Sequence, residues 1–194
     1  MDLTSIERSL LEQLAVGGRV VVERPQLGPP ISATRANTVR GVVLRDLLRG
    51  RLIDDADPLG IRIVGAYIVG PVDLRSVRCV VGLNLTTCRI AAPLQLQDAR
   101  LPALTLDGSH LVELAGDGLV TDGPVFLRQD DHGPVRVAAG DGVRFVGARI
   151  GGNLELDGAQ LENAGGNEQT GVALALDHAR VEGDVFLREG FKAV

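Results

Sequence analysis

The chain has 194 residues, a formal net charge of −5, 45% hydrophobic residues and only 3% aromatic residues, with no Trp. Such a length suits one domain, and a negative net charge gives no general attraction for nucleic acid, so we expect no direct nucleic-acid binding. The sequence shows neither a basic leader nor an apolar run of about 18 residues, and we expect a cytoplasmic protein without a membrane span.

A first helix is predicted directly at the N-terminus. Thr4 and Glu7 have the spacing of a capping box, in which each side chain bonds the other residue's backbone N–H. The apolar residues that follow fall on one helical stripe and are Ile6, Leu10, Leu11 and Leu14. We expect Gly17 and Gly18 to end this helix.

A short strand and a second helix follow. Arg19 to Glu23 has the composition of a strand, and the second helix should begin near Asn37 or Thr38 and run to Gly50. It would carry the apolar residues Val39, Val42, Val43, Leu47 and Leu48, with Gly41 as a local weakness. Because stacked repeats need a cover over their first open edge, we assign residues 1–57 as an N-terminal helical cap.

From about residue 61 to the end the chain repeats one pattern. Leu74, Leu85, Leu96 and Leu106 recur at near-regular spacing, and the principal apolar positions advance in steps of five or six. Those positions are 68, 74, 79, 85, 90, 96, 101, 106 and 111. A step of five fits neither a helix nor a single strand, but it fits a four-sided coil whose sides each point residues inward. Cys79 and Cys88 fall on inward positions and are interpreted as small core residues.

With its alternation of small and larger aliphatic residues, as in Leu94-Gln-Leu-Gln-Asp-Ala and Leu104-Thr-Leu-Asp-Gly-Ser, this segment resembles a degenerate pentapeptide-repeat protein. The resemblance implies an all-β solenoid, a right-handed quadrilateral parallel β-helix, over residues 58–194. Since two steps of five or six make each half-coil, a full coil should take about 21 residues. The chain is also similar to actinobacterial repeat proteins labelled membrane-associated oxidoreductases, through Thr38 to Arg40 and Ile63 to Ala66. No redox centre is recognisable among its residues.

A search for chemistry finds no catalytic, cofactor-binding or metal-binding constellation. Asp130, Asp131 and His132, with Asp122, form the densest polar cluster, but their neighbours indicate a solvated loop, and zinc would need a further spaced His or Cys. The sequence contains no phosphate-binding loop, no dinucleotide fingerprint and no nucleophile elbow. We therefore expect a protein that is not an enzyme and has no cofactor.

Outward positions of the repeat offer an interaction surface instead. Arginines precede many of the small-side apolar positions, and a full-coil spacing would stack Arg78 over Arg100. Phe126 and Phe186 should also point outward if Leu127 and Leu187 point inward, and exposed rings indicate contact with a partner. The candidate interaction surface comprises Arg78, Arg89, Arg100, Phe126, Arg149, Arg180 and Phe186.

Three functions fit these features. We favour a non-enzymatic scaffold that binds an unidentified protein partner or itself, through its outward faces and an uncapped C-terminal end after Gly190. A DNA-mimicking topoisomerase-binding protein is a second hypothesis, although arginines on the early repeats imitate duplex DNA poorly. The third is an oxidoreductase-associated protein, as the label of the similar proteins suggests.

Overall fold

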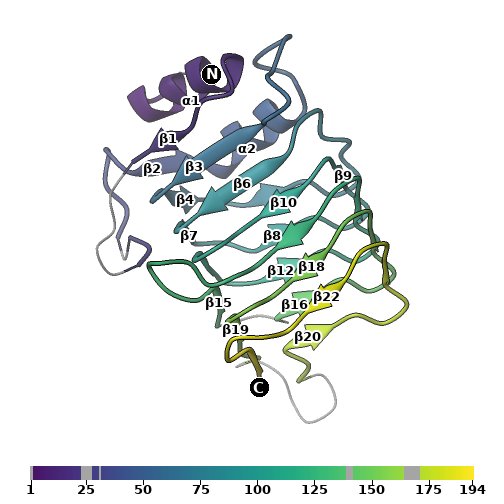
Figure 1. Ribbon diagram of the computed structural model, residues 1–194. Helices are drawn as coiled ribbons and strands as arrows, with labels where there is room; N and C mark the ends of the chain where they lie inside the picture. The colour runs from purple at the N-terminus through teal and green to yellow at the C-terminus, as the bar shows by residue number, and fades with distance from the viewer. Residues whose placement is uncertain (1, 23–27, 31, 139–141, 164–170) are drawn as a thin grey trace.

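A computed structural model describes residues 2–22, 28–30, 32–138, 142–163 and 171–194. It consists mostly of parallel strands in four stacked sheets, with two short helices at the N-terminal end (Figure 1). Helix α1 spans Ser5–Ala15 and helix α2 spans Gly41–Leu48. This arrangement is consistent with a parallel β-helix.

Sheets A and B contain seven strands each. In sheet A these are β1 (Val20–Val21), β3 (Ile61–Val64), β6 (Leu83–Thr86), β10 (Leu104–Thr105), β14 (Val125–Phe126), β18 (Leu154–Glu155) and β22 (Val185–Phe186). In sheet B they are β2 (Thr38–Arg40), β4 (Tyr67–Val69), β7 (Arg89–Ile90), β11 (His110–Leu111), β15 (Arg136–Val137), β19 (Gln160–Leu161) and β23 (Lys192–Ala193).

Sheets C and D are smaller, with five and four strands. Sheet C is built from β5 (Val72–Asp73), β8 (Leu94–Gln95), β12 (Leu114–Ala115), β16 (Val143–Arg144) and β20 (Leu174–Ala175). Sheet D is built from β9 (Arg100–Leu101), β13 (Val120–Thr121), β17 (Arg149–Ile150) and β21 (Arg180–Val181). From β6 onward the chain visits A, B, C and D in turn before returning to A, and we call one such passage a circuit.

The early circuits have the predicted length. Leu83 pairs with Leu104 and Leu104 with Val125, 21 positions further along the chain in each case. Later circuits are longer, since Val125 pairs with Leu154 and Leu154 with Val185. The parallel pairing is kept throughout because the extra residues lie in connections between strands and leave the paired strands in register.

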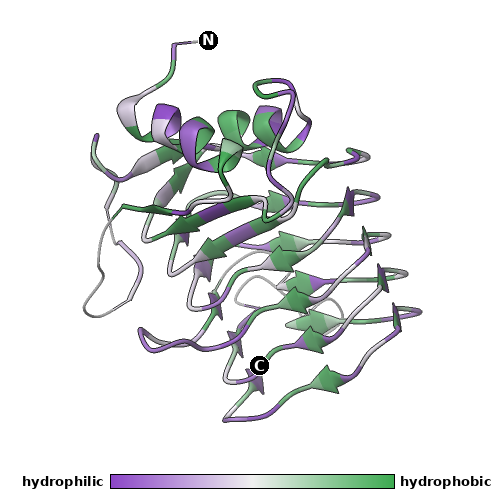
Figure 2. Ribbon diagram, turned by 45° about the horizontal axis from the view of Figure 1, so that its top comes forward, coloured by the Kyte–Doolittle hydropathy of each residue, from purple (hydrophilic) through white to green (hydrophobic). Residues whose placement is uncertain are grey.

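The repeat's apolar positions form the interior. Leu74, Leu85, Leu96 and Leu106 have no exposed surface, and each of the other predicted inward positions from 68 to 111 is buried as well. In Figure 2 green segments alternate with purple ones along the strands and helices, whereas the turns between strands are largely hydrophilic. The step of five therefore identified the core correctly over this part of the chain.

At the N-terminal end the first helix agrees with its prediction. Thr4 caps α1, and both bonds of the capping box with Glu7 are present. The predicted strand over Arg19 to Glu23 appears as β1, which pairs with β3; Glu23 lies outside the described residues.

The predicted second helix began too early. Thr38–Arg40 is strand β2 and pairs with β4, so α2 starts at Gly41. Pairing with β4 places Val39 in the core with no exposed surface, and this tertiary contact outweighs the local helical pattern. On the helix itself Leu44 is buried and Val42 is exposed, so the buried stripe differs from the predicted one at these two positions.

The glycine at the start of α2 has a packing role. A Cβ at Gly41 would lie 2.4 Å from the carbonyl oxygen of Pro71, in the connection that leads into β5. Helix α2 can approach β5 closely only because this position has no side chain. Gly41 is therefore required by packing, and it stands at the first position of α2 instead of inside the helix.

Candidate functional site

An arginine column runs down sheet D. Arg78 forms a parallel bridge with Arg100, Arg100 pairs with Val120, Val120 with Arg149, and Arg149 with Arg180. Each of these residues is followed by an inward neighbour, so the pleat of the sheet turns their side chains outward. We call Arg78, Arg100, Arg149 and Arg180 the arginine column. The predicted stacking of Arg78 over Arg100 is thus confirmed.

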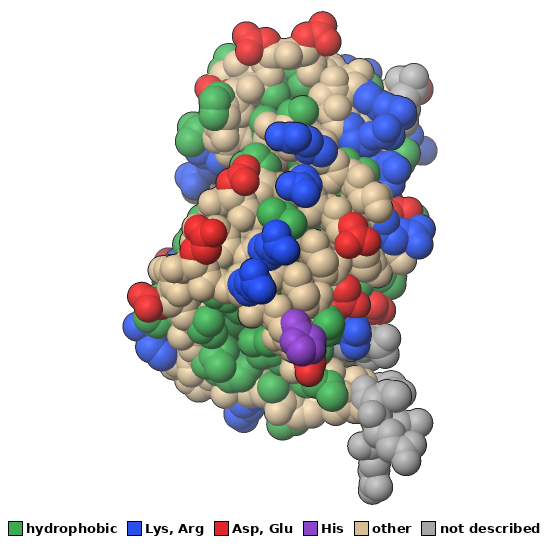
Figure 3. All heavy atoms as spheres, turned by 90° about the vertical axis from the view of Figure 1, so that its right-hand side faces the viewer, with side chains coloured by type: hydrophobic (Ala, Val, Ile, Leu, Met, Phe, Trp, Pro, Cys, Tyr) green, Lys and Arg blue, Asp and Glu red, His purple; other side chains and the backbone are tan. Residues whose placement is uncertain are grey.

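All four side chains of the arginine column are exposed. Within the part of the chain that the structure describes, none of them forms an ion pair, whereas seven other arginines do. The paired ones are Arg40, Arg45, Arg51, Arg75, Arg128, Arg144 and Arg188. Figure 3 shows basic side chains in a line down the middle of this face, with acidic side chains to either side.

Two shallow hollows accompany the column. One, of about 400 Å³, is lined by Arg78, Arg100 and Pro102, and the other, of about 450 Å³, by Arg149, Arg180 and Glu182. Val120 and Asp122 line both hollows, so the two adjoin where the column is interrupted by Val120. The face therefore offers a continuous recess with cationic groups along it and carboxylates at Asp122 and Glu182.

Stacking like charges in this way has an electrostatic cost. Neighbouring strands lie about 4.8 Å apart, and two unit charges at such a distance repel by roughly 1 kcal/mol in water. The energy is small because the groups are exposed, yet like charges directly opposite each other on a sheet destabilise it. An anion bound along the column would remove this repulsion and gain several charge-assisted hydrogen bonds.

The candidate surface predicted from the sequence is divided over three sheets. Arg100, Arg149 and Arg180 lie on sheet D, and Arg78 is bridged to its first strand, β9. Arg89 lies on sheet B, and Phe126 and Phe186 lie on sheet A. A single partner contacting one face therefore meets the arginine column but neither Arg89 nor the two rings.

Both rings point outward as predicted, but each is half-buried under an arginine. The guanidinium of Arg128 lies 4.0 Å from the ring centre of Phe126, and that of Arg188 lies 4.1 Å from that of Phe186. Carboxylates on neighbouring circuits hold these arginines: Arg128 is 2.6 Å from Asp107 and 3.1 Å from Glu155, and Arg188 is 2.6 Å from Asp157. The rings thus pack under arginines whose ion pairs connect successive circuits. The prediction that the rings are exposed was wrong.

The polar cluster at residues 130–132 has a structural explanation. Oδ1 of Asp130 accepts hydrogen bonds from the backbone N–H groups of His132 and Gly133, and Oδ2 accepts one from the hydroxyl of Thr87. Asp130 therefore closes a tight turn and attaches it to an earlier circuit. Among the described residues no group of three or more His, Cys, Asp or Glu is placed to hold a metal ion.

Neither cysteine has the environment of a reactive thiol. Cys79 and Cys88 are buried, and desolvation raises the pKa of each thiol to about 12. Because the thiolate is the nucleophilic form, both side chains are inert near neutral pH and serve as small core residues.

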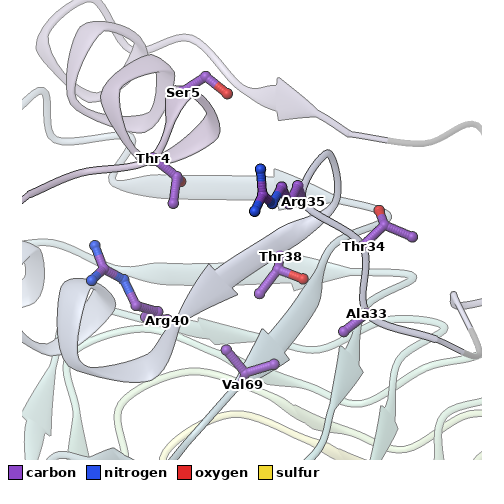
Figure 4. A pocket seen from close by; sticks show the side chains of 8 residues that line it. All are labelled: Thr4, Ser5, Ala33, Thr34, Arg35, Thr38, Arg40 and Val69. Atoms are coloured by element: carbon purple, nitrogen blue, oxygen red, sulfur yellow. The ribbon is translucent and has the colours of Figure 1, made fainter.

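A further hollow, of about 620 Å³, lies beside the N-terminal helix. Its lining includes Thr4, Arg35, Thr38 and Arg40, which Figure 4 shows at the start of α1, on β2 and on the segment before β2. Two of its polar residues already have structural partners, since Thr4 caps α1 and Arg40 forms an ion pair with Glu7. This hollow therefore lies where α1 meets the sheets, and among the described residues of its lining Arg35 is the cationic side chain that remains for contact with a ligand.

Sequence reasoning missed Arg136, which continues the outward column of sheet B beside His110. The longer connection between β14 and β15 removes it from the five-residue spacing. The short alternation Val135-Arg136-Val137, apolar on both sides of a charge, was the available signal.

No described helix has the length and apolar character needed to cross a membrane. No protein-family model, curated protein or solved structure matches the chain. The geometry of the arginine column is therefore the basis on which a function can be argued.

Proposed function

We propose that the chain is a non-enzymatic, cytoplasmic repeat scaffold of the pentapeptide-repeat type, with a right-handed quadrilateral β-helix, which binds an acidic protein partner through the arginine column. The observation that carries this proposal is the register of the four arginines without carboxylate partners among the described residues. Elsewhere in the same circuits Arg128, Arg144 and Arg188 each form an ion pair with an Asp.

The spacing of the charges suits an acidic segment of a protein. Arg78 and Arg100 form one neighbouring pair and Arg149 and Arg180 another, with Val120 between the pairs. At about 4.8 Å per strand the column extends over roughly 19 Å. Glu and Asp side chains three or four residues apart on a helix are about 5–6 Å apart, which matches each pair, while Val120 offers an apolar contact between them.

Mimicry of DNA is a weaker alternative because a DNA mimic must present rows of negative charge. Here the outward rows on sheets B and D are cationic, although the chain as a whole carries −5. The third hypothesis, an oxidoreductase-associated protein, has no particular arrangement of the described residues in its favour.

Charge reversal tests the proposal. The variant Arg149→Glu/Arg180→Glu alters the column, and Arg8→Glu/Arg35→Glu is a matched control, since both of its arginines are exposed and lie outside sheet D. A fluorescent glutamate-rich helical peptide should bind the unaltered chain with an affinity that falls as salt rises, and should bind the control equally well. The column variant should lose at least about tenfold in affinity. Equal loss in both variants, or none in either, contradicts the proposal.

The natural partner can be sought with the same variants. Proteins cross-linked to the unaltered chain in its own cells and absent from Arg149→Glu/Arg180→Glu are the expected partners. Their contact segments should be rich in Asp and Glu. A set of cross-linked proteins that the column variant leaves unchanged would place the interaction elsewhere.

A further inference from the structure

A second cationic group lies on sheet B and has a different composition. Arg89 pairs with His110 and His110 with Arg136 in parallel register, so the three outward side chains occupy neighbouring strands β7, β11 and β15. Their inward neighbours Ile90, Leu111 and Val137 are buried, which fixes the outward direction of the three. We call Arg89, His110 and Arg136 the cationic triad.

The triad faces away from the arginine column. The chain passes from sheet B through sheet C before it reaches sheet D, and Figure 1 places β7, β15 and β19 on the opposite side from β9. A ligand on the triad therefore occupies a separate face, and its binding does not depend on the proposed role of sheet D.

No acidic side chain shares the outward column of sheet B among the described residues. The residues in register beyond the triad are Tyr67 before Arg89 and Gln160 after Arg136. Neither arginine of the triad forms an ion pair within the described part of the chain. Three potential donors thus stand together, and neither arginine is paired with a described carboxylate.

His110 is half-buried between the two arginines, and its ring forms no hydrogen bond with a described residue. Neither ring nitrogen of His110 is among the fully buried side-chain polar atoms that lack a partner in the described part of the chain, so the unbonded ring keeps some contact with solvent. Burial first, and then the charges of Arg136 and Arg89, lower the pKa of His110. The neutral form of the imidazole is therefore favoured, and a negative charge placed beside it would favour the protonated form.

We infer that the cationic triad is an oxyanion-binding site that takes a phosphate group carrying two negative charges. Adjacent strands place His110 about 4.8 Å from each arginine in the sheet. A phosphate centred over His110 can accept hydrogen bonds from both guanidinium groups and from the ring between them. A single carboxylate has two oxygens and leaves part of the triad unmatched, whereas a tetrahedral oxyanion has an oxygen for each donor.

Binding at this site takes up a proton. The bound dianion stabilises the imidazolium form, so it raises the pKa of His110 from its lowered value, and by linkage the affinity rises as pH falls through the range in which the ring titrates. The groups that face His110 from the neighbouring strands are Arg89 on β7 and Arg136 on β15, and both stay charged throughout. The arginine column of sheet D contains no titrating group and has no such pH dependence.

Sulfate is a suitable probe because it remains a dianion across the range in which His titrates. Ring-proton NMR should show the pKa of His110 rising on addition of sulfate, with His132 and His178 as internal references; the variant His110→Gln assigns the signal. In Arg89→Gln/Arg136→Gln the rise should vanish and sulfate affinity should fall by at least about tenfold. The matched control Arg149→Gln/Arg180→Gln should keep both the rise and the affinity.

Two results would overturn the inference. One is a His110 pKa that sulfate leaves unchanged in the unaltered chain. The other is an equal rise in the triad variant and in the control, which would indicate general screening by salt. Thermal melting of each variant establishes that it is folded. A comparison of inorganic phosphate with a phosphoserine peptide at one pH identifies the source of the bound phosphate group. Tighter binding of the peptide indicates a phosphorylated protein as the ligand. Equal affinities for the two indicate free phosphate.

Discussion

Oε2 of Glu7 lies 2.6 Å from Nη2 of Arg40, and the Glu7 side chain has no exposed surface. Its other oxygen, Oε1, accepts hydrogen bonds from Nε of Arg40 at 2.8 Å and from the backbone N–H of Arg40 at 3.0 Å. Since Glu7 is on α1 and Arg40 ends β2 directly before α2, this pair holds the first helix against the beginning of the second. Burial alone would raise the pKa of Glu7, but the bonds from Arg40 and Thr4 outweigh it and bring the pKa to about 2.

Replacing Glu7 by Gln should destabilise the chain near neutral pH. The change removes the charge but keeps the size, and it leaves Arg40 without its partner at a partly buried site, so we expect a loss of about 3 kcal/mol in the free energy of unfolding. Urea denaturation at pH 7 measures it. Glu12→Gln is the control on the same helix, where the side chain is exposed, and it should change stability by less than about 0.5 kcal/mol.

The same pair predicts an acid dependence of stability. The pKa of Glu7 is lowered in the folded chain, so its contribution is fully present above the ordinary value of 4.5 and is lost as pH falls from there towards about 2. The difference in stability between the unaltered chain and Glu7→Gln should therefore shrink between these two pH values. A difference that stays constant across that window would show that the pair does not act through its charge.

A substitution at Leu96 tests the assignment of the inward positions. It has no exposed surface and lies in the core between neighbouring circuits, so Leu96→Ala should cost about 2–5 kcal/mol through lost burial and a residual cavity. Arg89→Ala, on an outward position, should change stability little. Thermal or chemical denaturation separates the two. If both variants melted at the same temperature, the inward and outward assignment would be wrong.

Substitutions at two glycines distinguish the energetic cost of backbone strain from that of steric crowding. Gly60 and Gly147 have similar positive φ values, +74° and +67°, but a Cβ at Gly60 would lie 2.4 Å from the carbonyl oxygen of Gly82, whereas one at Gly147 meets nothing within 4 Å. Gly147→Ala should therefore cost about 1 kcal/mol, the ordinary strain of a left-handed backbone. Gly60→Ala should cost clearly more, because backbone must move. Equal losses in denaturation experiments would mean that the contact relaxes freely.

The two cysteine thiols should be unreactive in the folded chain. Burial raises the pKa of Cys79 and of Cys88 to about 12, so a thiol reagent at pH 8 should modify neither until the chain is unfolded in guanidinium, when both should react. Mass spectrometry counts the modified residues. Rapid modification of Cys88 under native conditions would contradict its complete burial.

The interior of the repeat was predictable because one inward residue in each step must be apolar whatever the rest of the sequence does. Leu74 to Leu106 and the two cysteines therefore lie where the spacing puts them. The stacking of Arg78 over Arg100 followed from the same spacing, since the circuits up to this point have nearly constant length.

The sheets on which Arg149, Arg180 and Phe186 lie could not be predicted in the same way. Which side an outward residue occupies depends on the number of residues in every connection before it, and the connections lengthen after Phe126. Thr38–Arg40 was misassigned for a related reason, because the strand β2 exists through its pairing with Tyr67–Val69 and carries no local signal of its own. The partners of Phe126 and Phe186 likewise come from neighbouring circuits.

The connection between Phe126 and Arg136 is longer than the one between Thr105 and His110, yet His110 and Arg136 are direct neighbours in sheet B. The distance between two outward charges is thus set by backbone hydrogen bonds between strands and is independent of the length of chain that separates them. Residues could be added to or removed from such a connection without changing the charge spacing on sheets B and D. Loops of different length can therefore be placed on this chain while the same cationic faces are preserved.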